Sequence, residues 1–83
     1  SNEYTNIDTL DELKAHIGAK REAGEVPGWV LVGWDGTEES EAKIKEETGF
    51  TTRNIPFNAP VKKEKCIVTG KPAVHTVWIA RAY

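Results

Sequence analysis

The stretch WVLVGW, residues 29–34, decides the fold of this chain. It has no charged or polar side chain, which is typical of a strand that is covered on both faces of its sheet. Asp35 and Gly36 then end the apolar run, as turn residues do. We therefore expect a buried strand here, with the rest of the chain arranged around it.

The segment before this strand is predicted to be a helix. Asp8 or Thr9 can cap it, and Glu12 stands three residues after Thr9, as a capping box requires. The apolar residues that follow at helical spacing are Leu10, Leu13 and Ile17. Ile7 can staple the entry to the helix, and Gly24 is the expected stop.

The segment after the strand is predicted to be a second, shorter helix. Thr37 can cap it, and Gly49 lies just past its expected end at Thr48. Most of its side chains are charged, so Ala42 and Ile44 are almost its only apolar anchors.

The second half of the chain is expected to add three strands, over Phe50–Phe57, Lys65–Val68 and Ala73–Ala82. The order helix, strand, helix, strand, strand, strand predicts an α+β (mixed α/β) fold. It should contain a small mixed sheet of about four strands with two helices packed on it. The 83 residues leave room for one domain, residues 1–83, in which Ser1-Asn2 is interpreted as a possible remnant of tag cleavage.

Charge and cysteine content narrow the possible functions. The net charge of −2 argues against stand-alone nucleic-acid binding, which usually shows a basic excess. Four nearby lysines are interpreted as solvated loop residues rather than as a nucleic-acid site: Lys62, Lys63, Lys65 and Lys71. No stretch approaches the ~20 apolar residues of a membrane span. Cys66 is the only cysteine, which excludes an internal disulfide and favours a reducing compartment.

No catalytic residue is recognised in the chain. His16 and His75 have no nucleophile or acidic partner at a known spacing; His16 is expected to be solvated and His75 half-buried in its strand. Cys66 lacks a convincing base partner. The tryptophans are expected at the core or at an interface rather than as platforms for stacked bases. No cofactor is therefore expected in this fragment.

Residues 66–72, CIVTGKP, resemble a zinc knuckle with one ligand changed. A knuckle has two cysteines separated by two residues, and the glycine that follows lets backbone N–H groups point at the sulfurs. Here Thr69 occupies the second cysteine position, while Gly70 and Lys71 remain. The turn is therefore expected to survive without metal.

A series of blocks extends this resemblance over residues 29–83. The blocks, in order, are WDGTEESEAKIKEETG (34–49), RNIP (53–56), CIVTGKPA (66–73) and IARAY (79–83). Together they closely resemble the C-terminal domain of prolyl-tRNA synthetases of the archaeal/eukaryote-like class, with a looser match in the first helix.

The resemblance also implies a degenerate zinc site. Zinc-binding members of the family carry two pairs of ligand cysteines, which fall by position on Asp35 and Ser40 and on Cys66 and Thr69. Only Cys66 is retained, and neutral hydroxyls are poor zinc ligands, so no zinc is expected. Hydrogen bonds among Asp35, Ser40 and Thr69, and packing of the Cys66 thiol, are expected to replace the metal.

In this family the domain supports a larger enzyme. Such enzymes ligate proline to tRNA(Pro) in a class II catalytic domain that binds ATP and Mg, and they are expected in the cytoplasm as homodimers. The implied partners are the catalytic and anticodon-binding domains of the same chain, tRNA(Pro) through the parent enzyme, and no membrane. In the family the chain ends in a tyrosine whose carboxylate points toward the active site, and Tyr83 matches it.

Two alternatives come from other classes. The first is a stand-alone protein-interaction module with a degenerate zinc-ribbon fold, which should show an exposed apolar patch unrelated to a synthetase. The second is a small RNA-binding domain, which should bind tRNA with salt-sensitive affinity. The acidic charge balance counts against the second.

Overall fold

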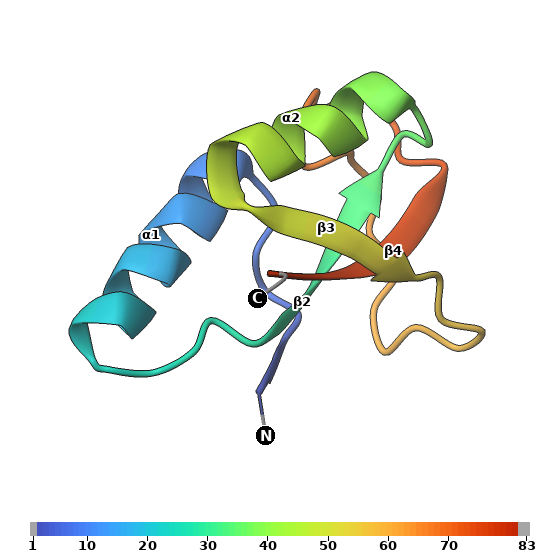
Figure 1. The fold of residues 1–83 in the computed structure, drawn as a ribbon. Helices are drawn as coiled ribbons and strands as arrows, with labels where there is room; N and C mark the ends of the chain where they lie inside the picture. Colours follow the sequence, from blue (N-terminus) through green and yellow to red (C-terminus); the bar gives the residue numbers. More distant parts are fainter. Residues whose placement is uncertain (1, 82–83) are drawn as a thin grey trace.

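Four strands form one mixed sheet in the order β1-β2-β4-β3 (Figure 1), and the computed structural model describes residues 2–81. The strands are β1 (Glu3–Tyr4), β2 (Trp29–Trp34), β3 (Phe50–Asn54) and β4 (His75–Arg81). β1 is parallel to β2, whereas β4 is antiparallel to both of its neighbours. With the helices α1 (Leu10–Glu22) and α2 (Glu38–Thr48), this confirms the predicted α+β fold and its four-stranded mixed sheet.

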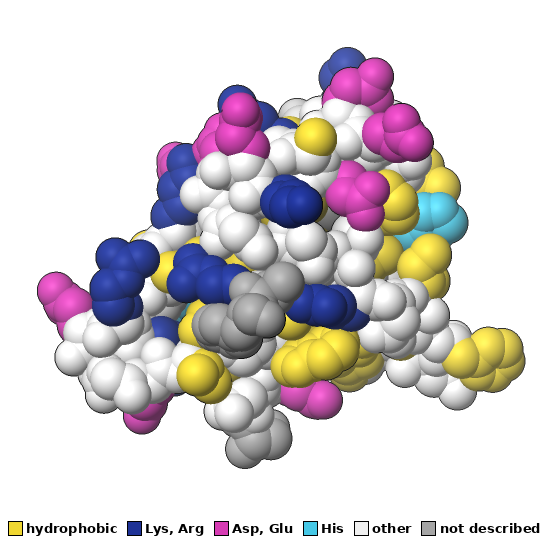
Figure 2. All heavy atoms as spheres, in the orientation of Figure 1, with side chains coloured by type: hydrophobic (Ala, Val, Ile, Leu, Met, Phe, Trp, Pro, Cys, Tyr) yellow, Lys and Arg dark blue, Asp and Glu magenta, His cyan; other side chains and the backbone are white. Residues whose placement is uncertain are grey.

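Both helices begin where their capping residues predict. Thr9 caps α1, and a complete capping box joins it to Glu12: the Glu12 amide donates to Thr9 Oγ1 at 3.1 Å, and the Thr9 amide donates to Glu12 Oε1 at 3.2 Å. Thr37 caps α2 by accepting from the Ser40 amide at 3.1 Å, and Gly49 follows its last residue. Charges of both signs are interspersed on the exposed sides of the helices (Figure 2).

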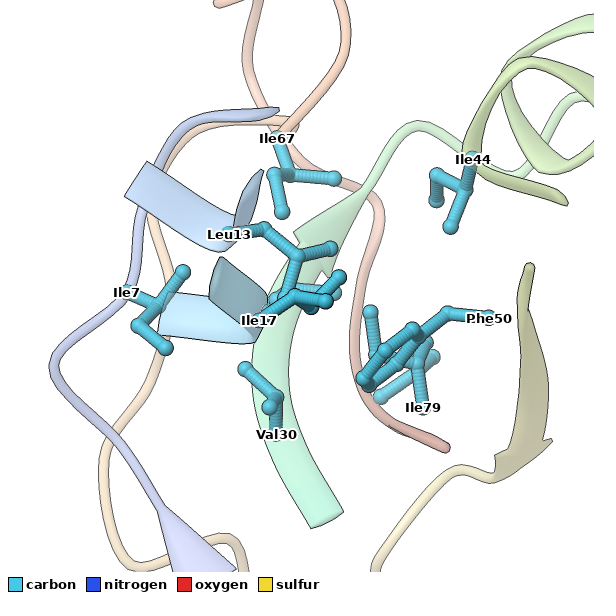
Figure 3. Close-up of a cluster of buried hydrophobic side chains, with 10 residues drawn as sticks. Ile7, Leu13, Ile17, Val30, Ile44, Phe50, Ile67 and Ile79 are labelled. Atoms are coloured by element: carbon cyan, nitrogen blue, oxygen red, sulfur yellow. The ribbon is translucent and has the colours of Figure 1, made fainter. Parts of the chain in front are cut away.

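The core lies between the two helices and one face of the sheet. Leu13 and Ile17 from α1 and Ile44 from α2 point toward β2 and β4, as Figure 3 shows. Ala42, predicted as an anchor of α2, is exposed. The buried neighbours of Ile44 on this helix are Ser40 and Thr48, whose hydroxyls are hydrogen-bonded. Burial of each large aliphatic side chain contributes roughly 1.5–3 kcal/mol.

The long connection between β3 and β4 covers the opposite face of the sheet. The Lys63 amide donates to Thr76 Oγ1 at 2.9 Å, and Leu31 on this face is fully buried. Lys63 was expected to be a solvated loop charge, but its side chain is buried, and its ammonium donates to Thr5 O at 2.6 Å and to Asp8 Oδ1 at 2.7 Å. β2 is therefore covered on both faces, as its apolar sequence predicts.

The predicted strand Lys65–Val68 is wrong. Cys66 forms only an isolated parallel bridge with Gly33, and Lys65 forms an isolated bridge with Pro72. The backbone turns back here, because the Cys66 amide donates to Lys71 O at 2.7 Å and the Gly70 amide donates to Cys66 O at 2.9 Å. These backbone amides and carbonyls bond to each other within the turn, so they do not pair with a neighbouring strand of the sheet.

Other boundaries also differ from those predicted. β3 ends at Asn54 rather than Phe57, because an irregularity after Thr52 shifts its register against β4. β4 begins at His75 rather than Ala73, and its predicted end at Ala82 lies outside the described residues.

The short strand β1 was not predicted, and the ring of its residue Tyr4 contacts His16. His16 was expected to be solvated, but it is half-buried, with Nε2 2.8 Å from Pro27 O and its ring 4.4 Å from that of Tyr4. His75 is half-buried, as expected, against Trp34. Within residues 2–81, neither helix has the length and apolar character needed to cross a bilayer.

Glu47 joins the two helices by ion pairs, which predicts acid-sensitive stability. Its carboxylate lies 2.5 Å from Lys14 Nζ and 2.7 Å from Lys43 Nζ, and these two cations lower the pKa of Glu47 to about 2. Because the folded-state pKa lies below the ordinary value, the ion pairs stabilise the fold above pH ~4.5, and this contribution is lost as the pH falls toward 2.

We expect Glu47→Gln to flatten the decrease in stability between pH 5 and 2.5, measured by urea unfolding with tryptophan fluorescence. The effect should shrink in high salt, because exposed ion pairs are screened. Glu46→Gln, at the exposed neighbouring position, is the control. Identical pH profiles for Glu47→Gln and the unmodified chain would contradict the assignment.

Candidate functional site

The positions that correspond to zinc ligands meet where β2 ends. Asp35 follows β2 directly, and Ser40 lies in the first turn of α2. The chain returns at Cys66, which bridges to Gly33, and then turns through Thr69. Two segments that are distant in sequence, residues 35–40 and 66–69, are thereby joined at one polar cluster, which we call the knuckle cluster: Asp35, Ser40, Cys66 and Thr69.

The Asp35 carboxylate organises one half of the knuckle cluster. Its Oδ1 accepts from the Thr37 amide at 3.1 Å and from the Thr37 hydroxyl at 2.8 Å, and its Oδ2 accepts from the Ser40 hydroxyl at 2.9 Å. Burial acts to raise the pKa of Asp35, but the hydrogen bonds from Thr37, Ser40 and Cys66 outweigh it and lower the pKa. The carboxylate is therefore held in its charged form.

The Cys66 thiol organises the other half. It is buried, and Sγ lies 3.9 Å from Ser40 Oγ. Burial acts to raise the pKa of the thiol, but hydrogen bonds from the backbone and hydroxyl of Thr69, and from the Val68 and Asp35 backbone, outweigh it and lower the pKa.

The predicted replacement of the metal by hydrogen bonds is present in one half of the cluster. Asp35 and Ser40 are directly bonded. Thr69 differs from the prediction: its Oγ1 accepts from the Lys71 amide at 3.2 Å, and no bond to Asp35 or Ser40 is found among the described residues. Gly70 follows with φ 73°, a conformation that glycine adopts without strain, so the turn keeps its shape.

The donor set of the knuckle cluster does not fit a structural zinc ion. Such sites use four ligands drawn from thiolate, imidazole and carboxylate groups. Here one thiol and one carboxylate stand beside two hydroxyls, and the Ser40 hydroxyl is already directed at Asp35. Within the described part of the chain, residues 2–81, no group of three or more His, Cys, Asp or Glu side chains could hold a metal.

Gly33 is a site residue that the sequence analysis did not identify. A Cβ atom at Gly33 would lie 2.1 Å from Lys65 O, and the Ile67 amide donates to Gly33 O at 2.9 Å. The knuckle backbone therefore packs directly on β2 because this residue has no side chain. The signal was available, since a glycine inside an apolar strand often marks a close backbone approach.

We expect Gly33→Ala to destabilise the chain by about 2 kcal/mol or more, because the added methyl group overlaps a backbone carbonyl. Gly18→Ala is a matched control in α1. A Cβ atom at Gly18 meets nothing within 4 Å, and replacing a helical glycine should be neutral or stabilise by up to ~1 kcal/mol. Urea unfolding of both variants tests this, and equal stabilities would contradict it.

The absence of zinc remains a prediction. Chain purified with added zinc and under reducing conditions should carry far less than one zinc per molecule by elemental analysis. The positive control is the triple variant Asp35→Cys, Ser40→Cys and Thr69→Cys, which should bind one zinc through four thiolates. Stoichiometric zinc on the unmodified chain would contradict the prediction.

The fold and the knuckle cluster define a small α+β domain with a zinc-knuckle backbone whose ligands are mostly replaced. Comparison with known families makes the assignment specific: the family described as "Prolyl-tRNA synthetase, C-terminal" matches residues 10–83. The chain belongs to this family of prolyl-tRNA synthetase C-terminal domains.

Relatives and solved structures agree with this assignment. The chain is 58% identical over 80 residues to a proline–tRNA ligase of Symbiobacterium thermophilum, covering 96% of this chain and 16% of that protein. It is 46% identical over 83 residues to one from Bacteroides fragilis, covering 95% and 15%. The prolyl-tRNA synthetase of Cryptosporidium parvum, solved with L-proline and AMP, has a similar fold, with a TM-score of 0.74, 21% identity, and coverage of 99% of this chain and 16% of that chain.

The chain therefore spans about one sixth of the length of these relatives. Tyr83, the predicted active-site-facing residue, lies outside the described residues.

Proposed function

We propose that this chain is a non-catalytic, supporting domain of a proline–tRNA ligase, a class II aminoacyl-tRNA synthetase that uses ATP to join proline to tRNA(Pro). The observation that carries the proposal is the family match over residues 10–83. Two side chains that were considered for catalysis pack within the fold. His16 lies against Pro27 and Tyr4, and Cys66 is buried in its own turn. ATP and Mg would be bound by the catalytic domain, and the enzyme would act in the cytoplasm.

The proposed partners are the catalytic and anticodon-binding domains of the same polypeptide, with tRNA(Pro) bound through the whole enzyme. A domain of this size buries a limited core, so support from a larger partner is physically reasonable. Large apolar side chains are available for such contacts, among them the exposed Val26, Trp29 and Val61.

We further propose that the parent enzyme is a homodimer of the archaeal/eukaryote-like class. The order of the sequence blocks and the knuckle backbone support the class. The curated relatives named above are bacterial, so the class is a statement about enzyme type and not about the source of the chain.

Tyr83 is proposed to direct its carboxylate toward the active site of the parent enzyme. Support comes from Arg81, two residues earlier, which is firmly held. Its guanidinium donates to Thr48 O from Nε at 3.3 Å and from Nη2 at 3.0 Å, and it lies 5.8 Å from the centre of the Phe50 ring. A carboxylate placed from such an anchor can accept charge-assisted hydrogen bonds from the catalytic domain.

Assays of the full-length protein that carries these 83 residues test both the proposed ligase function and the proposed role of Tyr83. We expect proline-dependent ATP–pyrophosphate exchange and charging of tRNA(Pro). Removing Tyr83 should lower kcat/KM roughly tenfold or more, as expected for loss of a charge-assisted hydrogen bond. Phe57→Ala, at a fully exposed position, should leave kcat/KM unchanged. A full-length protein that charges no tRNA with proline contradicts the function, whereas unchanged activity without Tyr83 contradicts only the role of the tyrosine.

One observation favours the alternative of a protein-interaction module. Phe57 is 100% exposed, next to the exposed Ile55, on the connection between β3 and β4. If the full-length protein lacks the ligation activity, this loop becomes the first place to look for a binding surface.

A further inference from the structure

The turn that joins β2 to α2 (Figure 1) contains the only Asp-Gly pair in the sequence, Asp35-Gly36. In such a pair the backbone nitrogen of the glycine can attack the aspartate side chain. Glycine favours this attack because it has no side chain to obstruct the approach and its backbone is conformationally permissive. The other two aspartates, Asp8 and Asp11, precede residues that carry side chains. Asp35 is therefore the aspartate at which this reaction is easiest.

The reaction passes through a cyclic imide. The Gly36 nitrogen bonds to Asp35 Cγ and loses its proton, while one C–O bond of the carboxyl group breaks and its oxygen leaves as water. Water then adds to one of the two ring carbonyls. Addition at Cγ breaks the new C–N bond and restores aspartate, whereas addition at the backbone carbonyl breaks the original peptide bond and leaves isoaspartate. One water is released and one is consumed, so no other reagent is needed.

Both carboxylate oxygens of Asp35 are held by the start of α2. Oδ1 accepts from the Thr37 amide at 3.1 Å and from the Thr37 hydroxyl at 2.8 Å, and Oδ2 accepts from the Ser40 hydroxyl at 2.9 Å. Ser40 is only 3% exposed, so water has little access to replace its hydroxyl as a donor. Loss of either oxygen as water therefore requires at least one of these hydrogen bonds to break.

The backbone on both sides of the pair is held as well. The Val74 amide donates to Trp34 O at 2.9 Å, and the Trp34 indole N–H donates to Thr37 O at 3.0 Å. A Cβ atom at Gly36 would lie 3.7 Å from His75 Cδ2, so the glycine packs beside that ring. Rotation of the backbone into the geometry of the cyclic imide therefore requires local opening of the turn.

We propose that Asp35-Gly36 is a site of isoaspartate formation, which the hydrogen bonds from Thr37 and Ser40 suppress in the folded chain. Isoaspartate adds one atom to the main chain between β2 and α2 and attaches the carboxylate directly to Cα. The product therefore cannot restore the same bonds to Thr37 and Ser40, and it is the kind of substrate that isoaspartyl methyltransferases esterify. The site is independent of the proposed function, because it depends only on the fold around residues 34–40.

The test compares the folded and the unfolded full-length protein at one mildly acidic pH, the latter in guanidinium chloride. Isoaspartate at residue 35 is quantified by peptide mapping with electron-transfer fragmentation, and by methyl transfer from an isoaspartyl methyltransferase. We expect the folded protein to form it at least about tenfold more slowly, because the reaction must await local opening. Equal rates in the two states, or no isoaspartate at residue 35 in the unfolded protein, overturn the proposal.

Variants separate the hydrogen bonds from overall stability. Ser40→Ala and Thr37→Val each remove a hydroxyl donor to Asp35 and should speed isoaspartate formation in the folded protein by roughly threefold to tenfold. Thr37→Ser keeps the donor and should not.

The matched control is Thr9→Val, which removes the cap of α1 at a similar cost in stability without a contact to Asp35. Its rate should equal that of the unmodified protein. Equal acceleration by Thr9→Val and Thr37→Val, or unchanged rates in both Ser40→Ala and Thr37→Val, overturns the proposal. Ser40→Ala leaves the capping hydroxyls in place, so it decides the test if circular dichroism shows that Thr37→Val is unfolded.

Discussion

The structure depends on one close backbone contact, between the knuckle and the central strand at Gly33. No side chain separates the two backbones there, so Ile67 can donate directly to the Gly33 carbonyl. This contact places Cys66 beside the end of β2, where Asp35 and Ser40 lie. It also directs the β3–β4 connection across the face of the sheet that the helices leave open, which completes the burial of the central strand.

A metal in a knuckle neutralises thiolates and cross-links two chain segments. In this chain hydrogen bonds order the first of these segments, with the Asp35 carboxylate as the acceptor and Thr37 and Ser40 as donors. The hydroxyl of Ser40 also lies next to the Cys66 sulfur, so the two halves of the cluster meet through one neutral group. Neutral hydroxyls cost less to bury than additional charges, which makes the exchange of ligands physically feasible.

Sequence reasoning succeeded where the signal was local. The unbroken apolar run identified β2, and the capping residues Thr9 and Thr37 located both helix starts. It failed where a contact depends on distant parts of the chain. β1 is only two residues long, too short to show a period, and it exists because Trp29 bonds to Asn2. Buried Ser40 replaced the expected anchor Ala42, because the partner of its hydroxyl lies in the preceding turn and no apolar pattern reports that.

The order of the strands has a consequence for synthesis on the ribosome. β4 is made last, yet it lies between β2 and β3 and pairs with both of them. Until it emerges, the two earlier strands have no common neighbour, and the backbone edges of β2 and β3 that pair with β4 have no partner strand. Nascent chains of this domain must therefore wait for their final strand before the sheet can close, so a prematurely terminated product would expose its core to cellular quality control.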